Sequence, residues 1–255
     1  MVTRTVSMRK ELARSYAFMA RGDMSGTRVV ESPVGRAVYT DELPRRLDGN
    51  YLWVNRASEP EELVAEAARL ERRLIFVPDP ELGDALAPWF KQQGWRIDRH
   101  VVMAQLREPE READLSLVHE VSEPDLRAAR RRVLADEPWA TPEVLDQIFA
   151  AKALIGERVR TRFFAVELEG EVVSYSDLYL DGADAQVEDV GTVPEHRNTG
   201  RATAVVLGAI VEARAAGAEF VFLVADANDW PKVLYGRLGF DEVGHYTKFF
   251  APPAK

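Results

Sequence analysis

Six consecutive residues, 197–202, form the part of this sequence best suited to bind a phosphate group. Their sequence is Arg-Asn-Thr-Gly-Arg-Ala, and they separate a β-branched run over 187–193 from a helical pattern that starts at Ala202. Pro194 ends the preceding strand, because proline cannot donate to a sheet ladder. A turn containing Gly and Asn that opens into a helix presents unpaired backbone N–H groups at the positive end of the helix dipole, where an anion is stabilised.

Two carboxylates, Glu188 and Asp189, lie in the strand that leads into this turn. Side chains alternate along a strand, so the two acids are expected on opposite faces and cannot share one role. One face would carry Glu188, Val190 and Thr192. The other face would carry Val187, Asp189 and Gly191.

The spacing Arg-x-x-Gly-x-Ala over 197–202, preceded by a strand and Pro-Glu-His, resembles the acetyl-CoA pyrophosphate loop of the GNAT superfamily of N-acetyltransferases. The other features that fall where this family has them are a strand at 220–225, Asn228, Leu-Tyr at 234–235 and Gly-Phe at 239–240. The resemblance covers about residues 115–250. It implies a mixed α/β (α+β) fold with sheets flanked by helices, and acetyl-CoA as the cosubstrate.

The resemblance also implies which residues would hold acetyl-CoA. Backbone N–H groups of the loop would receive the pyrophosphate, and the pantetheine arm, which resembles a short peptide, would add to the splayed end of the strand. Gly191 suits the close approach of a ligand there. Asn198 stands where the family more often has Gly, and Asn tolerates left-handed backbone; Arg201 replaces an aliphatic residue and reaches either a CoA phosphate or solvent. The implied cofactor-binding residues are Val190, Gly191, Thr192, Arg197, Asn198, Thr199, Gly200, Arg201, Ala202, Thr203 and Asn228.

Acetyl transfer to an amine requires two proton movements. The amine, whose pKa is about 10 when it is Lys-like, must lose a proton. The leaving thiolate, whose conjugate thiol has a pKa of about 8.5 as in Cys, gains one. By resemblance, Glu188 takes the position of a general base, often acting through water, and Tyr235 takes that of the acid that protonates the sulfur. Two alternatives stay open: Tyr235 as a core aromatic at helical spacing, and Asn228 as a helix cap.

The first half of the chain repeats part of this pattern without the loop. Trp89-Phe90, Gly94-Trp95 and His100 match Leu234-Tyr235, Gly239-Phe240 and His245 at one constant offset. In place of the loop, residues 55–62 contain three carboxylates and no Gly, and would repel a pyrophosphate. We therefore expect a degenerate GNAT-like domain over 1–107 and a catalytic GNAT acetyltransferase domain over 115–255, as in some tandem GNAT proteins, with a charged linker between them.

The composition is that of a globular protein: 255 residues, 46% hydrophobic and 29% charged, with a formal net charge of -9 and no cysteine. The acidic balance disfavours nucleic acid as a partner, and no apolar run is long enough for a membrane helix. The absence of Cys fits a cytoplasmic location. The one basic cluster, Arg127 with residues 130–132, is expected to be a solvated helix face, and no histidine spacing predicts a metal site.

The predicted function is an acetyl-CoA-dependent N-acetyltransferase, an acyltransferase that transfers an acetyl group to a primary amine by direct attack on the thioester. The alternative is a non-catalytic sensor or scaffold that binds CoA or acyl-CoA. The expected acceptor is a small-molecule or peptidyl amine, and the expected assembly is a monomer or homodimer. The acceptor cleft would lie between helices at 124–158 and the hairpin at 177–184. The acids there, Asp136, Glu137, Asp181 and Asp184, favour a cationic amine, and Trp139 would pack on an apolar or a cationic acceptor, whereas the arginine cluster over 127–132 argues for an anionic one.

Overall fold

The computed structural model describes residues 2–22 and 24–252 of the chain. Contacts divide the chain into two compact units, and each unit draws on distant parts of the sequence. Unit 1 contains residues 1–102, 225–229 and 242–255, and unit 2 contains residues 103–224 and 230–241. None of the described helices is both long and apolar enough to cross a membrane.

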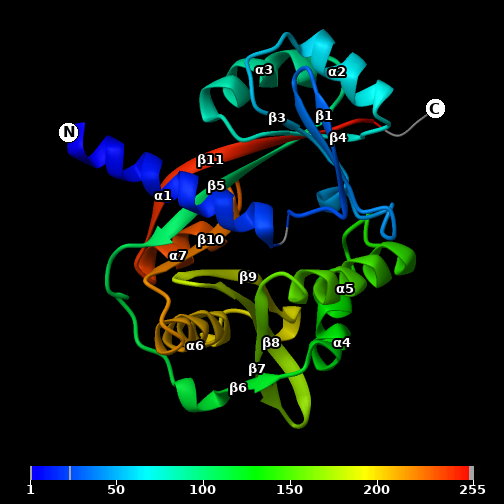
Figure 1. Cartoon of the computed structure of the whole chain (residues 1–255). Helices are drawn as coiled ribbons and strands as arrows, with labels where there is room; N and C mark the ends of the chain where they lie inside the picture. The colour runs from blue at the N-terminus through cyan, green and yellow to red at the C-terminus, as the bar shows by residue number, and fades with distance from the viewer. Residues whose placement is uncertain (1, 23, 253–255) are drawn as a thin grey trace. The chain divides into compact units, whose positions relative to one another are not determined.

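Unit 1 combines a mixed sheet with three helices (Figure 1). Its strands are hydrogen-bonded in the order β1-β2-β3-β4-β11-β5, and β3 and β4 run parallel. The elements are α1 (Val2–Arg21), β1 (Arg28–Ser32), β2 (Gly35–Tyr39), β3 (Tyr51–Val54), α2 (Pro60–Arg69), β4 (Leu74–Val77), α3 (Pro80–Gln92), β5 (Arg96–Gln105) and β11 (Phe240–Phe250). Apolar side chains at helical spacing on α2 and α3, including Leu63 and Phe90, pack on the strands and are fully buried.

The last strand of the chain belongs to unit 1. β11 pairs antiparallel with β4, from Thr247 opposite Val77 to Phe250 opposite Leu74. Phe249 on β11 stacks on Phe90 of α3, with ring centroids 4.2 Å apart. Unit 1 therefore takes core residues from both halves of the sequence.

The repeated sequence pattern adopts equivalent local structures. Both α3 and α7 (Pro231–Arg237) are followed by a glycine with left-handed backbone, Gly94 at φ 77° and Gly239 at φ 89°. A strand follows each glycine, β5 after Gly94 and β11 after Gly239. A division of the chain into two GNAT-like domains at 1–107 and 115–255 stays a prediction.

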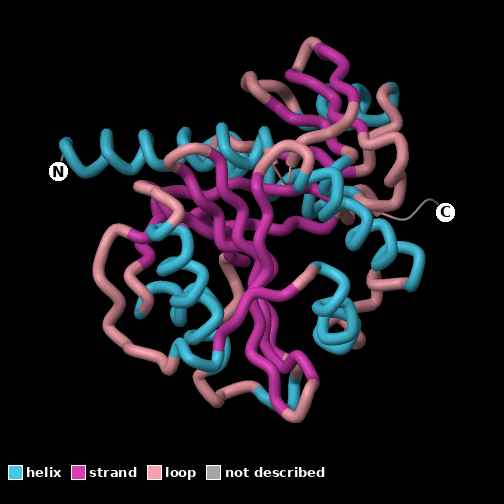
Figure 2. The backbone as a smooth tube through the Cα atoms, turned by 60° about the horizontal axis from the view of Figure 1, so that its bottom comes forward, coloured by secondary structure: helices cyan, strands magenta, loops and turns pink. Residues whose placement is uncertain are grey.

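Unit 2 is a sheet with strand order β10-β9-β8-β7-β6, covered by helices on both faces (Figures 1 and 2). Neighbouring strands from β6 to β9 are antiparallel, whereas β10 runs parallel to β9. Helix α6 packs on one face, and α4 and α5 pack on the other. The elements are β6 (Val118–Val121), α4 (Glu123–Val133), α5 (Pro142–Gly156), β7 (Arg160–Leu168), β8 (Glu171–Asp181), β9 (Asp184–Thr192), α6 (Arg201–Ala215) and β10 (Phe220–Asp226). The predicted mixed α/β class is confirmed.

Candidate functional site

The predicted phosphate-binding turn joins β9 to α6. A single 3-10 turn at Pro194–His196 follows the strand, and the chain then takes left-handed backbone at Asn198 (φ 61°) and Gly200 (φ 81°). Both are residue types that reach this region at low cost. The first helical hydrogen bond of α6 runs from the N–H of Ala204 to the carbonyl of Gly200, at 3.0 Å. The N–H groups of residues 201–203 precede that ladder, as at any helix start.

Side chains of the turn hold its backbone in place. Thr199 donates its hydroxyl to the carbonyl of His196 at 2.6 Å, and Arg197 donates Nε to the carbonyl of Thr192 at 3.2 Å. The Arg201 guanidinium contacts the Thr199 hydroxyl. Residues 197–200 are exposed, whereas Thr203 is buried in the first turn of α6. The turn is thus an ordered, solvent-facing structure that carries two guanidinium groups.

The strand before the turn separates from its parallel neighbour. β10 pairs with β9 from Phe220 opposite Asp184 to Leu223 opposite Val187, and the described register ends there. On its other side, β9 stays paired with β8 as far as Thr192 opposite Ser174. One edge of residues 188–192 therefore carries backbone groups that β10 does not pair, next to the phosphate-binding turn.

A β-bulge lies in the same five residues, and it overturns the predicted alternation of side chains. Asp177 of β8 is opposite Glu188, but Tyr175 is opposite Gly191, so two residues of β9 oppose the one residue between them. Asp189 has left-handed backbone, with φ 50°. Because of this extra residue, Glu188, Asp189 and Gly191 lie on the face that carries Asp177. Val190 packs on the opposite face with Ala204 and Val205 of α6, and Thr192 contacts Ser174 on that side.

The two neighbouring acids have different partners. Glu188 accepts a hydrogen bond of 2.6 Å from Nε2 of Gln186, a buried neutral amide. Asp189 instead forms ion pairs with two cations, Arg130 of α4 at 2.9 Å and Lys152 of α5 at 3.2 Å. The Arg130 Nε–H is not aligned for a hydrogen bond, so this contact is an ion pair alone.

Arg130 and Lys152 both also bind a second, buried carboxylate, that of Asp177. Asp177 is fully buried and accepts from Arg130 and from Lys152 Nζ, the latter at 2.7 Å. Lys152 also donates to the Tyr179 hydroxyl at 2.8 Å. Burial opposes the charge of Lys152, but Asp177 and Asp189 outweigh it and raise the lysine pKa well above its usual value. Burial raises the pKa of Asp177, and the two cations oppose that rise.

The buried cluster of Arg130, Lys152 and Asp177 corrects the prediction that the arginines of 127–132 form a solvated helix face. Arg130 is only 1% exposed, so it is not part of a solvated helix face, although Arg127, Arg131 and Arg132 are more exposed and pair with surface acids. Lys152 and Asp177 were not predicted. The available signal is that Lys152 interrupts the apolar run 148–155 of α5 and that Asp177 lies within β8, away from the acids at the two ends of that strand, because buried charges occur in pairs.

The structure gives Gly191 a packing reason for being small; the predicted close approach of a ligand there stays a prediction. A Cβ atom on Gly191 would lie 2.3 Å from Cζ of Tyr175. The Tyr175 ring therefore fills the space beside this glycine, and it lies 5.5 Å from the Arg130 guanidinium carbon. The backbone of Gly191 remains part of the open edge of β9.

Tyr235 and Asn228 lie apart from this strand and turn in the sequence. Tyr235 on α7 is 7% exposed and packs edge-on against Phe240, at 6.3 Å between centroids. Asn228 is exposed and belongs to unit 1, whereas the other predicted site residues belong to unit 2. The cap position of α7 is Trp230, so the alternative in which Asn228 caps that helix is wrong.

The residues predicted to face the acceptor lie in the connection between α4 and α5 and in the β8–β9 hairpin. Trp139 is 42% exposed, and its indole N–H donates to Glu137 at 2.9 Å. Asp136 is exposed as well, while Asp181 and Asp184 are half-buried. Within the described part of the chain, no group of three His, Asp or Glu residues is arranged to hold a metal ion.

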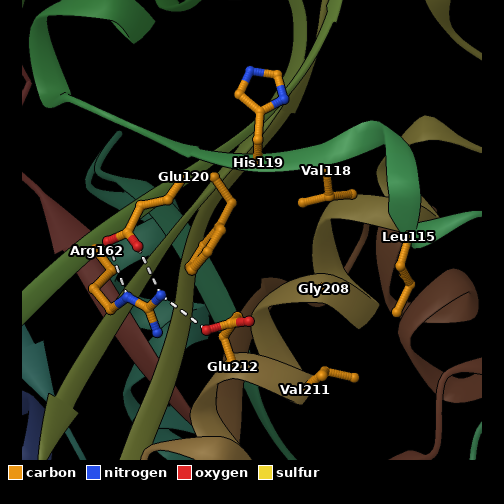
Figure 3. A pocket seen from close by; sticks show the side chains of 9 residues that line it. Leu115, Val118, His119, Glu120, Arg162, Gly208, Val211 and Glu212 are labelled. Atoms are coloured by element: carbon orange, nitrogen blue, oxygen red, sulfur yellow. Dashed lines mark hydrogen bonds and ion pairs between the residues drawn. The ribbon is translucent and has the colours of Figure 1, made fainter.

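A pocket of about 230 Å³ lies elsewhere in unit 2, beside β6, β7 and α6 (Figure 3). Inside it, the Arg162 guanidinium is held between Glu120 at 2.7 Å and Glu212 at 2.8 Å. Gly208 lines it on α6, roughly 12 Å along the helix from Gly200 at 1.5 Å per residue. No predicted site residue lines this pocket.

Comparison with known proteins places this geometry in a family. The model of the acetyltransferase (GNAT) family matches residues 123–240, which include β7 to β10, the turn and α7. No curated protein has a significant sequence match to the chain.

Several solved structures share the fold. A GCN5-related N-acetyltransferase from Kribbella flavida is 18% identical over 95% of this chain and 96% of its own, with a TM-score of 0.61. A functionally unknown conserved protein from Staphylococcus epidermidis is 13% identical over 89% and 94%, with a TM-score of 0.65. A tandem GNAT protein from the clavulanic acid biosynthesis pathway is 14% identical over 89% and 83%, with a TM-score of 0.54. These identities show likeness of fold alone. The family match alone identifies residues 123–240 as a domain of the GNAT acetyltransferase family, whose general chemistry is acyl transfer from acetyl-CoA.

Proposed function

We propose that this protein is an acetyl-CoA-dependent N-acetyltransferase that acetylates a primary amine by direct attack on the thioester. One observation carries the proposal: the pairing of β9 with β10 ends at Val187, directly before a turn with left-handed Gly200 at the start of α6. The unpaired strand edge matches the amides of a pantetheine arm, and the helix start matches a pyrophosphate.

Acetyl-CoA would be held mainly by backbone. The N–H groups at the start of α6 and the guanidinium groups of Arg197 and Arg201 would receive the phosphates, and the open edge of residues 190–192 would pair with pantetheine. Thr199 and Asn198 keep the turn in the required shape. A role for Asn228 on the pantetheine arm stays part of the proposal, supported by the family resemblance alone.

The chemistry assigns one proton to each of two side chains. The amine nitrogen attacks the thioester carbon, an N–C bond forms and the C–S bond breaks. Glu188, directly or through water, takes the proton that the amine loses, and Tyr235 gives a proton to the departing sulfur. The burial of Tyr235 suits a group that acts away from solvent and also suits its packing on Phe240.

The acceptor would be a small-molecule or peptidyl cationic amine. Four acids and an exposed tryptophan lie on the elements where it would enter, and the chain is acidic as a whole, with a formal net charge of -9. Unit 1 would not bind the cofactor, because the start of α2 carries Glu61 and Glu62 in its first turn. We propose a cytoplasmic location on the absence of cysteine from the sequence.

Isothermal titration with acetyl-CoA tests the binding part, and we expect one site per chain. Gly200→Glu should abolish acetyl-CoA binding, since it adds a negative carboxylate to the predicted phosphate-binding turn. Gly170→Glu is the matched control: Gly170 also has left-handed backbone (φ 84°) and open surroundings, but it lies in the β7–β8 turn. Two sites per chain, or binding that survives Gly200→Glu, would contradict the assignment.

Release of free CoA across a panel of amines, amino acids and peptides tests the catalytic part. We expect turnover with cationic acceptors. Activity confined to acidic acceptors would refute the charge argument. Binding of acetyl-CoA without turnover on a broad panel would instead favour a CoA or acyl-CoA sensor.

A further inference from the structure

Asp189 holds a backbone conformation that ordinary residues avoid. Its φ is 50°, and left-handed backbone is uncommon outside glycine, although Asp and Asn reach it more easily than most residues. Such a conformation persists where the surroundings determine it from several sides. At Asp189, the side chains that hold this conformation are the two cations Arg130 and Lys152.

The cations approach from two different helices. Arg130 of α4 and Lys152 of α5 both contact Oδ2 of Asp189, at 2.9 and 3.2 Å. Each cation is also bound to buried Asp177, so moving it away from Asp189 would break a buried ion pair as well. The Asp189 side chain itself is 31% exposed, so the clamp lies at the edge of the buried cluster.

The clamped residue stands where β9 changes its pairing. Glu188 directly precedes Asp189, and the pairs with β10 end one residue earlier, at Val187. Without the bulge, regular alternation would continue and Gly191 would leave the face that carries Glu188. The bulge therefore decides which of the residues after Glu188 share its face, and it lies directly after the point where pairing with β10 ends.

We propose that Asp189 is a positioning residue: clamped by Arg130 and Lys152, it maintains the bulge that orients residues 190–192, the strand edge proposed to bind the pantetheine arm, relative to Glu188. This inference rests on the proposed function, because it concerns how the same site is built. Asp189 itself transfers no proton in this scheme.

Three substitutions of Asp189 separate backbone shape from ion pairing. Asn tolerates left-handed backbone and keeps an oxygen that the cations can contact, Gly tolerates the backbone without the anchor, and Ala loses both. We expect the acetyl-CoA Kd to change less than about threefold for Asp189→Asn. For Asp189→Ala it should rise at least about tenfold, with Asp189→Gly between them.

A pH profile separates positioning from a merely structural role. Among the residues that the structure describes, the charged or titratable groups on this face include Arg130 and Glu123 from α4, Lys152 from α5, Asp177, Tyr175 and Tyr179 from β8, and Asp189 beside Glu188. Asp189→Asn removes a negative neighbour, so the acidic limb of kcat/KM should move to lower pH. Lys152→Met removes a positive neighbour and should move that limb to higher pH.

The control is Arg131→Met, one residue along α4, which removes an exposed ion pair of 2.8 Å with Asp146. It should leave both affinity and pH profile unchanged. If the unaltered protein fails to bind acetyl-CoA, the proposed function itself is wrong. If it binds and turns over, but Asp189→Ala folds and binds equally well, or Asp189→Asn leaves the acidic limb in place, the positioning role is wrong. Should Lys152→Met not fold, the Asp189 series decides alone.

Discussion

Glu188 and Asp189 are neighbours in sequence and lie on one face of the same strand, so their partners must distinguish them. Asp189 contacts two cations, Arg130 and Lys152, which hold its side chain in the cluster. Glu188 accepts a hydrogen bond from the neutral amide of Gln186. We therefore keep Glu188 as the proposed base, because Asp189 is already held by Arg130 and Lys152.

Gln186 should tune that base. Gln186→Leu removes the 2.6 Å donor to the Glu188 carboxylate, so the charged form loses stability. We expect the acidic limb of kcat/KM to move up by roughly one pH unit, equivalent to about 1.4 kcal/mol. A pH-rate profile measures it, with Gln92→Leu, an exposed glutamine of α3, as the control. An unmoved limb would mean that Gln186 does not bear on the base.

Tyr235 should act on the chemical step alone. In Tyr235→Phe the ring keeps its packing on Phe240, and only the hydroxyl is lost. We expect kcat to fall by more than about tenfold with little change in acetyl-CoA affinity, as for a proton donor used in the transition state. Steady-state kinetics and titration check this. Normal turnover would make Tyr235 a packing residue, with water or another donor serving the thiolate.

At the scale of the element, α6 is bounded by two left-handed glycines that lie at opposite ends of the helix and have similarly open surroundings. Gly200 (φ 81°) precedes the helix at the phosphate-binding turn, and Gly217 (φ 92°) follows it. A Cβ atom at either position would meet nothing within 4 Å. Substitution at either glycine therefore tests backbone conformation without a steric clash.

These glycines give a matched pair of variants. Gly200→Ala and Gly217→Ala should each lower the free energy of unfolding by about 1 kcal/mol, because alanine disfavours left-handed backbone. Only Gly200→Ala should weaken acetyl-CoA binding, since only that end of the helix would face phosphate. Denaturant unfolding and titration measure the two effects. Equal affinity loss in both variants would point to general loosening of α6.

Sequence periodicity predicted the elements well and the site less completely. The run over 187–193 and the helix from Ala202 correspond to β9 and α6, because local patterns are set by residues close in sequence. The bulge at Asp189 was not predictable in this way, since it depends on cations from α4 and α5. Strict alternation therefore placed Gly191 and Asp189 correctly together but separated them from Glu188.

At the scale of the whole molecule, His100 in unit 1 should make stability depend on pH. Burial lowers its pKa to about 3, with Lys248 and Arg96 adding to the effect and Asp48 opposing it. The unfolded chain binds a proton at this histidine below about pH 6.5, whereas the folded chain does not until about pH 3, so the free energy of unfolding falls as the pH falls through this window. At pH 5 the loss is about 2 kcal/mol.

His100→Phe isolates this contribution. The substitution keeps a ring beside Tyr246, whose centroid lies 5.0 Å from that of His100, but removes the titration. Urea unfolding at pH 5 and pH 7 should differ by about 2 kcal/mol less in the variant than in the natural chain. An unchanged difference would mean that other groups set the pH dependence.

The first half of the chain should not fold by itself. Residues 1–107 lack β11, so β4 loses its antiparallel neighbour and Phe90 loses the stacked ring of Phe249. We expect poor dispersion in NMR spectra and no cooperative unfolding. Joining residues 240–252 to this fragment through a flexible linker should restore both. Cooperative unfolding of 1–107 alone would show that β11 is dispensable.

The membership of β11 in unit 1 also sets an order of events during synthesis. The chain leaves the ribosome from its amino terminus, so β4 emerges long before the strand that pairs with it. Every residue of unit 2 has been made by the time residue 250 appears. The unit whose sequence comes first is thus the one that finishes folding last, and until then the exposed edge of β4 is a place where chaperones or other nascent chains can bind.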